Sequence, residues 1–255
     1  MVRRIDWIIN KISRNFRSRP FHRSKYRAEI EFWKNELMLY EKWYDGKISL
    51  YNEPPPTVNE KIIVSSHKDS AILTWAKIHQ FSKYLEDLSL DRNAFKGFKV
   101  LDIGSGPIPS ACIFDNCELF CLDPLIEDYL KIGFPLHYYD HVKFIKGYSE
   151  DMPFEDHYFD AIISVNAIDH VDDFFKTAKE IERVLKPQGF MRMHIHYHKK
   201  TSAEPQELND DIVKEAFKWC SEWHKLSESS KKHGYSLNNT EELFTLWTNF
   251  NSIRN

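Results

Sequence analysis

The sequence lacks the runs and spacings that would tie the chain to a membrane or to a disulfide framework. No run of about eighteen apolar residues occurs, so we expect no membrane-spanning helix. The 4 cysteines include no Cys-x-x-Cys pair, which favours reduced thiols in a cytoplasmic protein. The basic start is followed by no long apolar segment, so no secretory signal is expected. No internal repeat is evident, which argues against a solenoid.

The length and the charge of the chain further limit the kind of protein it can be. A chain of 255 residues with 42% hydrophobic content can bury one large core. The net charge of -3 conceals an asymmetry, because residues 1–27 hold nine Lys or Arg against one Asp. The remainder of the chain is correspondingly acidic, which opposes a long track for nucleic-acid phosphates.

Two neighbouring segments predict a nucleoside pocket. An apolar run at 100–103 contains Asp102 and opens into Gly104-Ser105-Gly106. Such a glycine turn lets a strand lead into a helix while its N–H groups stay exposed to a ligand. The next apolar run ends at Asp123, about twenty residues on, where a carboxylate can bind a ribose diol.

The segments that follow continue a recognisable order. A strand-like run at 158–164 precedes a helical pattern at 174–185, and a turn at 185–189 leads into another strand at 190–197. Over roughly residues 97–200 this succession resembles class I S-adenosylmethionine-dependent methyltransferases. The resemblance implies an α/β, Rossmann-like fold with a seven-stranded, mostly parallel sheet and helices on both faces.

The resemblance also implies S-adenosylmethionine as cofactor and S-adenosylhomocysteine as product. In this family the glycine turn approaches the methionine half of the cofactor, and the second acidic position binds the ribose. Here Tyr148 stands where an aspartate is usual, and a third glycine is missing after Pro107. The residues that the resemblance places at the cofactor are Asp102, Gly104, Gly106, Asp123, Pro124, Ser149, Glu150 and Ser164.

Residues 1–90 are predicted to form an N-terminal helical cap, and residues 91–255 the cofactor-binding domain. Apolar residues at steps of three and four predict one helix over 26–44 and another over 69–85. Such a cap can cover the acceptor and exclude water. The alternative is that its aromatic stripe is ordinary core.

An apolar stripe with helical spacing also runs through the basic segment 1–20. A basic amphipathic helix can lie on an anionic membrane surface or present cations to a phosphorylated substrate. The alternative is a helix that packs its stripe against the protein. At the other end, residues 209–232 are predicted to be helical and residues 243–250 to form an antiparallel strand.

His170 is the first candidate for a catalytic base. It follows the predicted strand 158–164, and ligands gather at the carboxyl ends of such strands. The ordinary pKa of histidine suits proton transfer near neutrality, and the resembled family often has a histidine here. Asp169 or Asp172 is positioned either to orient the ring or to cap the next helix.

His194, His196 and His198 alternate along one strand and should share one face. A metal site needs further ligands and a supporting shell, which the sequence does not identify, so no metal is predicted. His194 is expected to pack beneath helices. His198 lies nearest the carboxyl end of the strand and is the second catalytic candidate.

These observations predict a methyltransferase that acts on an oxygen or nitrogen of a small polar, anionic acceptor, phosphate-bearing or sugar-linked. The flanks resemble bacterial methyltransferases of capsule and surface-glycan modification, including methyl phosphoramidate systems. Residues 164–167 lack the Asn/Asp-Pro-Pro-aromatic motif of DNA amino-methylating enzymes, so DNA is not expected. An RNA methyltransferase and a non-catalytic cofactor-binding scaffold stay open as alternatives. The assembly is expected to be a monomer or a homodimer.

Overall fold

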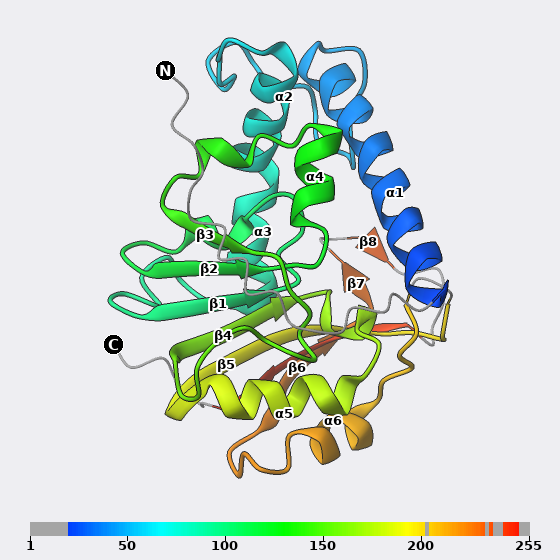
Figure 1. Ribbon diagram of the computed structural model, residues 1–255. Helices are drawn as coiled ribbons and strands as arrows, with labels where there is room; N and C mark the ends of the chain where they lie inside the picture. The colour runs from blue at the N-terminus through cyan, green and yellow to red at the C-terminus, as the bar shows by residue number, and fades with distance from the viewer. Residues whose placement is uncertain (1–19, 202–203, 233–234, 237–241, 250–255) are drawn as a thin grey trace.

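The computed structural model describes residues 20–201, 204–232, 235–236 and 242–249, and its centre is a seven-stranded sheet (Figure 1). In order across the sheet the strands are β3 (Val142–Ile145), β2 (Glu118–Leu122), β1 (Lys99–Ile103), β4 (Phe159–Val165), β5 (Leu185–Tyr197), β9 (Leu243–Thr248) and β6 (His224–Ser229). The first five are parallel, and β9 is antiparallel to both of its neighbours. The predicted fold class is confirmed. Two short strands, β7 (Lys231–Lys232) and β8 (Tyr235–Ser236), pair separately.

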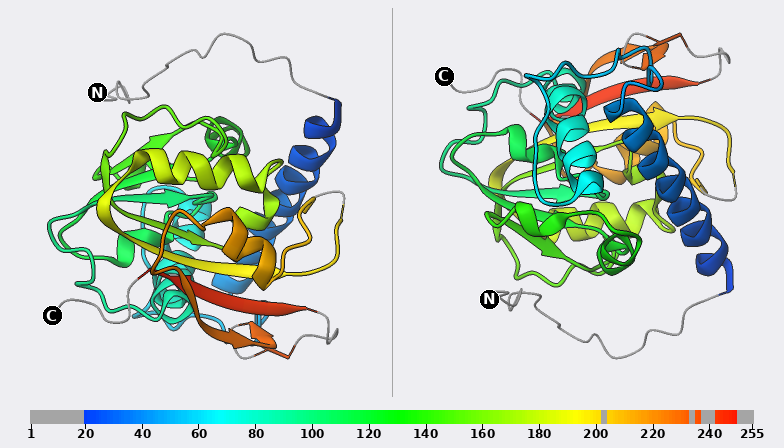
Figure 2. Two further views of the ribbon diagram at one scale, coloured as in Figure 1. Left: turned by 90° about the horizontal axis from the view of Figure 1, so that it is seen from below. Right: turned by 90° about the horizontal axis from the view of Figure 1, so that it is seen from above.

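Helices cover both faces of this sheet, as Figure 2 shows from below and above. The helices of one face are α1 (Pro20–Tyr44), α2 (His67–Trp75), α3 (Phe81–Leu88) and α4 (Ile126–Ile132). A π-helical turn, Ala76–Gln80, joins α2 to α3. The other face carries α5 (Phe174–Val184) and α6 (Asp210–Ala216).

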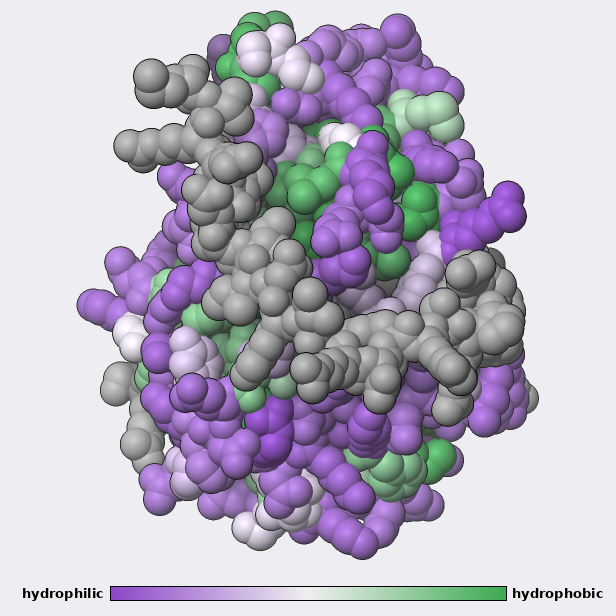
Figure 3. All heavy atoms as spheres, in the orientation of Figure 1, coloured by the Kyte–Doolittle hydropathy of each residue, from purple (hydrophilic) through white to green (hydrophobic). Residues whose placement is uncertain are grey.

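Alternation along the strands separates the two cores. Val100 of β1 and Ile163 of β4 pack with the α1–α4 side, whereas Leu101 and Ile162 pack with α5. Burial of both faces explains why these strands read as continuous apolar runs. In the orientation of Figure 1 the surface is mainly hydrophilic, with apolar side chains gathered between α4 and α1 (Figure 3).

The predicted helices of the cap are confirmed, but they share a core with the sheet. The helix expected over 26–44 is α1, and the one expected over 69–85 is the continuous run from α2 to α3. Trp43 of α1 lies edge-on to Trp75 of α2 with ring centroids 4.9 Å apart, and both are buried. The domain boundary at residue 90 stays a prediction.

The helix predicted over 209–232 is wrong in most of its length. After α6 the chain turns, and β6 pairs with β9 at the edge of the sheet. Trp223 stacks on Trp247 of β9 at 5.8 Å, so the aromatic side chain that suggested a helix face is buried against a strand instead. The strand expected over 243–250 is confirmed as β9.

The structure also settles which aspartate caps α5. Asp173 accepts a hydrogen bond from the Lys176 backbone N–H at 2.9 Å, as an N-cap residue does. Asp172, one of the two candidates, pairs with Lys25 instead. The helix predicted from residue 174 begins there.

Within the part of the chain that is described, no helix combines the length and apolarity needed to cross a membrane. The amphipathic stripe predicted in residues 1–20 lies almost wholly outside the described residues, so its interpretations stay predictions.

Gly104 lets the loops after β1 and β4 meet. Its φ is +70°, and a Cβ there would lie 2.3 Å from the Cβ of Ala167. Gly46, after α1, has a similar φ of +76°, but a Cβ there would meet no atom within 4 Å. A side chain at either position would strain the backbone, but only at Gly104 would it also meet a close steric contact.

We predict that Gly104→Ala destabilises the fold more than Gly46→Ala. The matched change at Gly46 should cost about 1 kcal/mol of unfolding free energy from backbone conformation alone. The added contact with Ala167 should raise the cost at Gly104 by about 1–3 kcal/mol. Urea unfolding of both variants measures the difference, and equal losses would contradict the close packing of the two loops.

Asp102 is a fully buried carboxylate at the core of β1. The Tyr84 hydroxyl, from α3, lies 2.9 Å from Oδ1 and 3.0 Å from Oδ2. Burial raises the pKa of Asp102 from 3.8 to about 8, and the hydrogen bond from Tyr84 only partly opposes this. The folded chain therefore holds this proton over a pH range in which the unfolded chain has lost it.

We predict that stability without cofactor falls as the pH rises from about 4 to about 8, because the unfolded state binds fewer protons there. Asp102→Asn removes this titration, so it should reduce the slope and make the variant more stable than the unaltered chain at pH 8. Urea midpoints at several pH values measure the slope. Asp140→Asn is the control, because the Asp140 side chain is 95% exposed, and a slope equal in all three proteins would refute the assignment.

Candidate functional site

A cavity of about 630 Å³ opens at the carboxyl ends of β1, β2 and β4. Its floor is the glycine turn after β1, from Gly104 to Pro107. Asp123 and Pro124, which follow β2, form a second wall, and the loop after β4 forms a third. This is the edge at which open α/β sheets bind their ligands.

The glycine turn and the second acidic position lie side by side, as the sequence predicts. The Gly106 backbone N–H donates to Oδ2 of Asp123 at 3.1 Å, and the Leu125 N–H donates to Oδ1 at 2.8 Å. Burial raises the pKa of Asp123 to about 7, and these two backbone bonds partly oppose the rise. Each carboxylate oxygen can accept more than one hydrogen bond, so the group can still receive ribose hydroxyls.

These features fit an adenosyl cofactor. The space is of the size that small-molecule sites commonly have, and its wall joins backbone N–H groups to a buried acceptor carboxylate. A side chain at Gly106 would meet only the Trp33 ring, at 3.8 Å, so the turn keeps its backbone open to the cavity. The residues present could therefore hold the methionine and ribose parts of S-adenosylmethionine.

Ser149 and Glu150 both line the cavity, where the resemblance places adenine. The Ser149 hydroxyl lies 3.1 Å from the Thr177 hydroxyl. Glu150 accepts backbone N–H bonds from Asp172, at 2.8 Å, and Asp173, so it also fastens the loop after β4. Their adenine contacts stay predictions.

Two of the expected cofactor residues are buried next to the cavity lining and do not reach the cavity itself. Asp102 is buried against Tyr84, and Ser164 donates to the Ile103 carbonyl at 3.0 Å. Both are fully buried and neither lines the cavity, so their positions suit support of the strand ends better than contact with a ligand. Their predicted cofactor contacts are not tested by this geometry.

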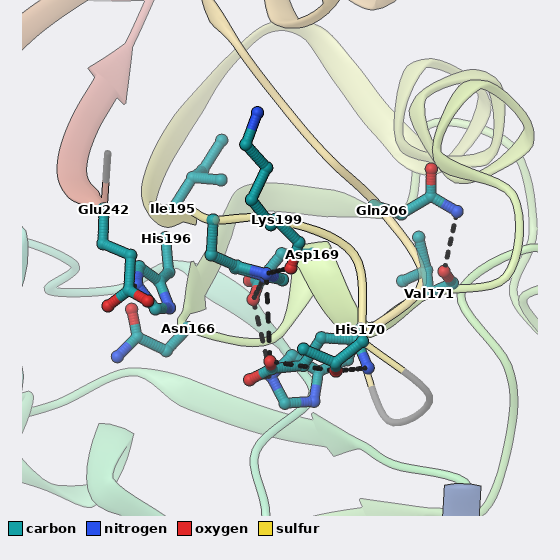
Figure 4. Close-up of polar contacts among 12 residues, drawn as sticks. Asn166, Asp169, His170, Val171, Ile195, His196, Lys199, Gln206 and Glu242 are labelled. Carbon is teal, nitrogen blue, oxygen red and sulfur yellow. Dashed lines mark hydrogen bonds and ion pairs between the residues drawn. The ribbon is translucent and has the colours of Figure 1, made fainter. Parts of the chain in front are cut away.

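His170 also lines the cavity, with its side chain 33% exposed. Its Nε2 atom is 3.4 Å from Oδ2 of Asp169 and 3.5 Å from Oε1 of Glu204. Figure 4 shows His170 and Asp169 together with His196 from the end of β5. This arrangement supports Asp169 as the residue that orients the ring.

His198 follows β5 and is buried beside the same carboxylate. Its Nε2 atom lies 3.3 Å from Oδ2 of Asp169, and this hydrogen bond raises the pKa of His198 to about 9. Burial raises the pKa of Asp169, but the His198 bond and the charge of His170 outweigh it, and the net shift is downward. His198 does not line the cavity, so its predicted catalytic role requires action through Asp169.

The histidines of β5 are divided between different surroundings. His194 is buried and stacks on Phe244 of β9 at 5.3 Å, with Nδ1 3.1 Å from the side-chain oxygen of Asn166. His194 was expected to pack beneath helices, but it packs against the neighbouring strand β9 instead. His196 lines the cavity, and its ring centroid is 4.8 Å from that of His198.

Helix α1 supplies a wall of the cavity that the sequence did not identify residue by residue. Lys25 donates to the backbone carbonyl of His170 and lies 3.1 Å from Oδ1 of Asp172. Glu29 and Trp33, one and two turns further along, also line the cavity. Helical spacing could have shown that these three share a face, but nothing local indicates what that face meets.

Comparisons with known proteins bear on the family of this domain and on its fold. Residues 101–193 match the model of the methyltransferase domain family. A sterol 24-C-methyltransferase of Pneumocystis carinii is 29% identical over 177 residues, which are 62% of this chain and 45% of that protein. The ubiquinone/menaquinone biosynthesis C-methyltransferase UbiE of Rickettsia prowazekii is 29% identical over 99 residues, covering 39% and 36%.

The chain thus spans less than half the length of these curated relatives. Among solved structures, the YcgJ protein from Bacillus subtilis superimposes with a TM-score of 0.51 at 15% identity, covering 67% of this chain and 97% of that one. That likeness supports the fold alone. Taken with the cavity at the ends of its strands, the matched segment 101–193 is a class I S-adenosylmethionine-dependent methyltransferase domain.

Proposed function

We propose that this protein transfers the methyl group of S-adenosylmethionine to an oxygen or nitrogen of a small polar acceptor. The observation that carries this proposal is one cavity that is lined both by Asp123 and the glycine turn and, at what we take as its acceptor end, by Asp169, His170 and Glu204. A bound cofactor supplies an already electrophilic methyl group. The chain therefore has to hold an acceptor lone pair in line with it, and such positioning can supply about 7 kcal/mol or more of the barrier.

The acceptor end favours a polar molecule. Its lining includes Lys25, His170, His196 and the carboxylates of Asp169 and Glu204. A largely apolar acceptor would leave these groups desolvated without new partners, which is costly. The curated relatives named above act, by their names, on carbon atoms of sterols and quinones, and this difference in acceptor is part of the proposal.

His170 is proposed as the base. Its imidazole is exposed to the cavity, and Asp169 lies on its Nε2 side at 3.4 Å. A hydroxyl acceptor must lose its proton as the new bond forms, and a base in hydrogen-bond reach accelerates this step. Asp169 would stabilise the imidazolium that results.

A phosphate-bearing or sugar-linked acceptor has less support from the cavity than a polar acceptor in general. Among the described residues that line the cavity, Lys25 is the one Lys or Arg, and it is already engaged with the loop after β4. An anionic acceptor would therefore need a further positive charge. The resemblance to capsule-modifying enzymes finds no support in the comparisons, and the basic segment on which an RNA substrate would depend is mostly outside the described residues.

We predict that Asp123→Ala weakens S-adenosylmethionine binding about 10- to 100-fold, because hydrogen bonds to a charged group are worth about 1.5–3 kcal/mol. Titration calorimetry on the full chain measures the dissociation constant. Asp140→Ala is the matched control, since that carboxylate is exposed and does not line the cavity. Absence of binding by the unaltered chain would sink the proposal.

Replacing His170 separates catalysis from cofactor binding. We predict that His170→Ala lowers kcat by about 10²- to 10⁴-fold on a hydroxyl acceptor, the usual contribution of a positioned base. The dissociation constant for S-adenosylmethionine should change less than about twofold, because His170 is not among the residues assigned to the cofactor. Methyl transfer is followed with a labelled methyl group and a panel of small polar acceptors. His141→Ala, at an exposed site, is the control, and undiminished turnover in His170→Ala would exclude the base role.

A further inference from the structure

Four side chains beside the acceptor end form a cluster that the proposed methyl transfer does not by itself explain. Each can offer a ligand atom, and these atoms all lie within 4.8 Å of one another. They come from three segments, namely the loop after β4, the end of β5 and the loop after β5. Figure 4 labels two of them, Asp169 and His196. The cluster consists of Asp169, His196, His198 and Glu204.

His198 has the environment of a metal-ligating histidine. Its Nδ1 atom lies 2.7 Å from the Lys199 carbonyl, which can accept Nδ1–H and so leaves Nε2 free to act as a ligand. Histidines that bind metals nearly always donate their second ring N–H in this way. Nε2 lies 3.3 Å from Oδ2 of Asp169, and ligand atoms around a tetrahedral Zn²⁺ are separated by about 3.3 Å. Two ligands are therefore already spaced for one ion.

The side chains of the other two ligands, His196 and Glu204, have room to move toward an ion. The side chains of His196 and Glu204 are 18% and 29% exposed, and both line the cavity. Glu204 offers a carboxylate oxygen within 4.8 Å of the other ligand atoms, so a rotation of its flexible side chain can bring it into the same coordination shell. A bound ion would be reachable from the cavity through these two side chains.

Asp169 gives the second, independent observation. Its side chain is fully buried, and Oδ1 has no hydrogen-bond partner among the described residues, while Oδ2 faces the two histidines His170 and His198. A buried carboxylate oxygen normally accepts hydrogen bonds, and leaving one unpaired is costly. A cation coordinated by this carboxylate would offset that cost.

We propose that Asp169, His196, His198 and Glu204 bind one divalent transition-metal ion of the Zn²⁺ or Mn²⁺ type at the acceptor end of the cavity. Two imidazoles with two carboxylates suit such ions, whereas Mg²⁺ prefers an all-oxygen shell. In a further step that rests on the proposed function, an oxygen of the acceptor completes the shell. The ion then supplies the positive charge that an anionic acceptor lacks among the lining residues.

The competing explanation is a metal-free ion-pair network. A protonated His198 can neutralise Asp169, and Glu204 can add to the pair, without any ion. Metal binding must then displace the proton, because only the neutral ring coordinates. The two explanations differ in whether the chain takes up an ion in a fixed ratio.

The test measures Zn²⁺ uptake by the full chain without cofactor or acceptor. Equilibrium dialysis with metal analysis should give one tightly bound Zn²⁺ per chain, and Co²⁺ should give a visible spectrum typical of nitrogen and oxygen ligands. Glu204→Gln keeps size and shape, and it should weaken Zn²⁺ binding at least about tenfold. His198→Ala should do the same, and it should abolish the rise in melting temperature that Zn²⁺ gives the unaltered chain.

His67→Ala is the matched control. His67 also faces a carboxylate, with Nε2 2.8 Å from Oδ1 of Asp45, but this pair is exposed and belongs to no larger cluster of ligands among the described residues. Its loss should leave the tight Zn²⁺ site unchanged. Uptake that is absent, or equal in the unaltered chain and Glu204→Gln, overturns the site in favour of the ion-pair network. Full competition by Mg²⁺ overturns the choice of ion.

Calorimetry with S-adenosylmethionine on the same preparations keeps the two proposals apart. If the cofactor binds and Zn²⁺ does not, the metal site fails while the methyltransferase proposal stands. If Zn²⁺ binds and the cofactor does not, the methyltransferase proposal fails while the metal site stands. Glu204→Gln should also leave the dissociation constant of the cofactor within about twofold, because Glu204 is not among the residues assigned to the cofactor.

Discussion

The hydrogen bond from the Gly106 backbone to the Asp123 carboxylate is the contact on which the site depends. It joins the ends of two adjacent parallel strands, and the 3.1 Å distance fixes the turn after β1 against the residue after β2. Because burial disfavours the charge on Asp123, backbone N–H groups are needed to stabilise it. The same donors hold the carboxylate in the wall of the cavity. The bonds that stabilise the local fold are thus the same ones that would hold Asp123 in place for a nucleoside.

Much of this arrangement could be predicted from the sequence, because strand ends in a parallel sheet meet at one edge. Local patterns therefore sufficed for the glycine turn, for Asp123 and for the place of His170. They did not suffice for the chain after α6, where pairing with β9 overrode a helical pattern. Nor could they show that α1 forms a wall of the cavity, since Lys25 meets the His170 loop across 145 positions of sequence.

The acceptor end shows a related limit. The alternating histidines of β5 were visible in the sequence, but the absence of further ligands argued against a metal. Asp169 was considered only as a partner for His170 or as a helix cap, and Glu204 lies in a stretch without a local pattern. The turn that follows β5 brings Glu204 back to the end of β4, where it meets both His170 and His198. A contact of this kind arises from loop geometry, which spacing along the chain does not encode.

The close approach of Gly104 to Ala167 has a consequence for variation among related chains. The two backbones are so near that the β-carbon of residue 167 occupies the space that a side chain at residue 104 would need. A lineage that enlarges one of these positions must shrink or displace the other. The pair should therefore drift together or remain fixed, while the exposed neighbours in both loops are free to diversify with the substrate.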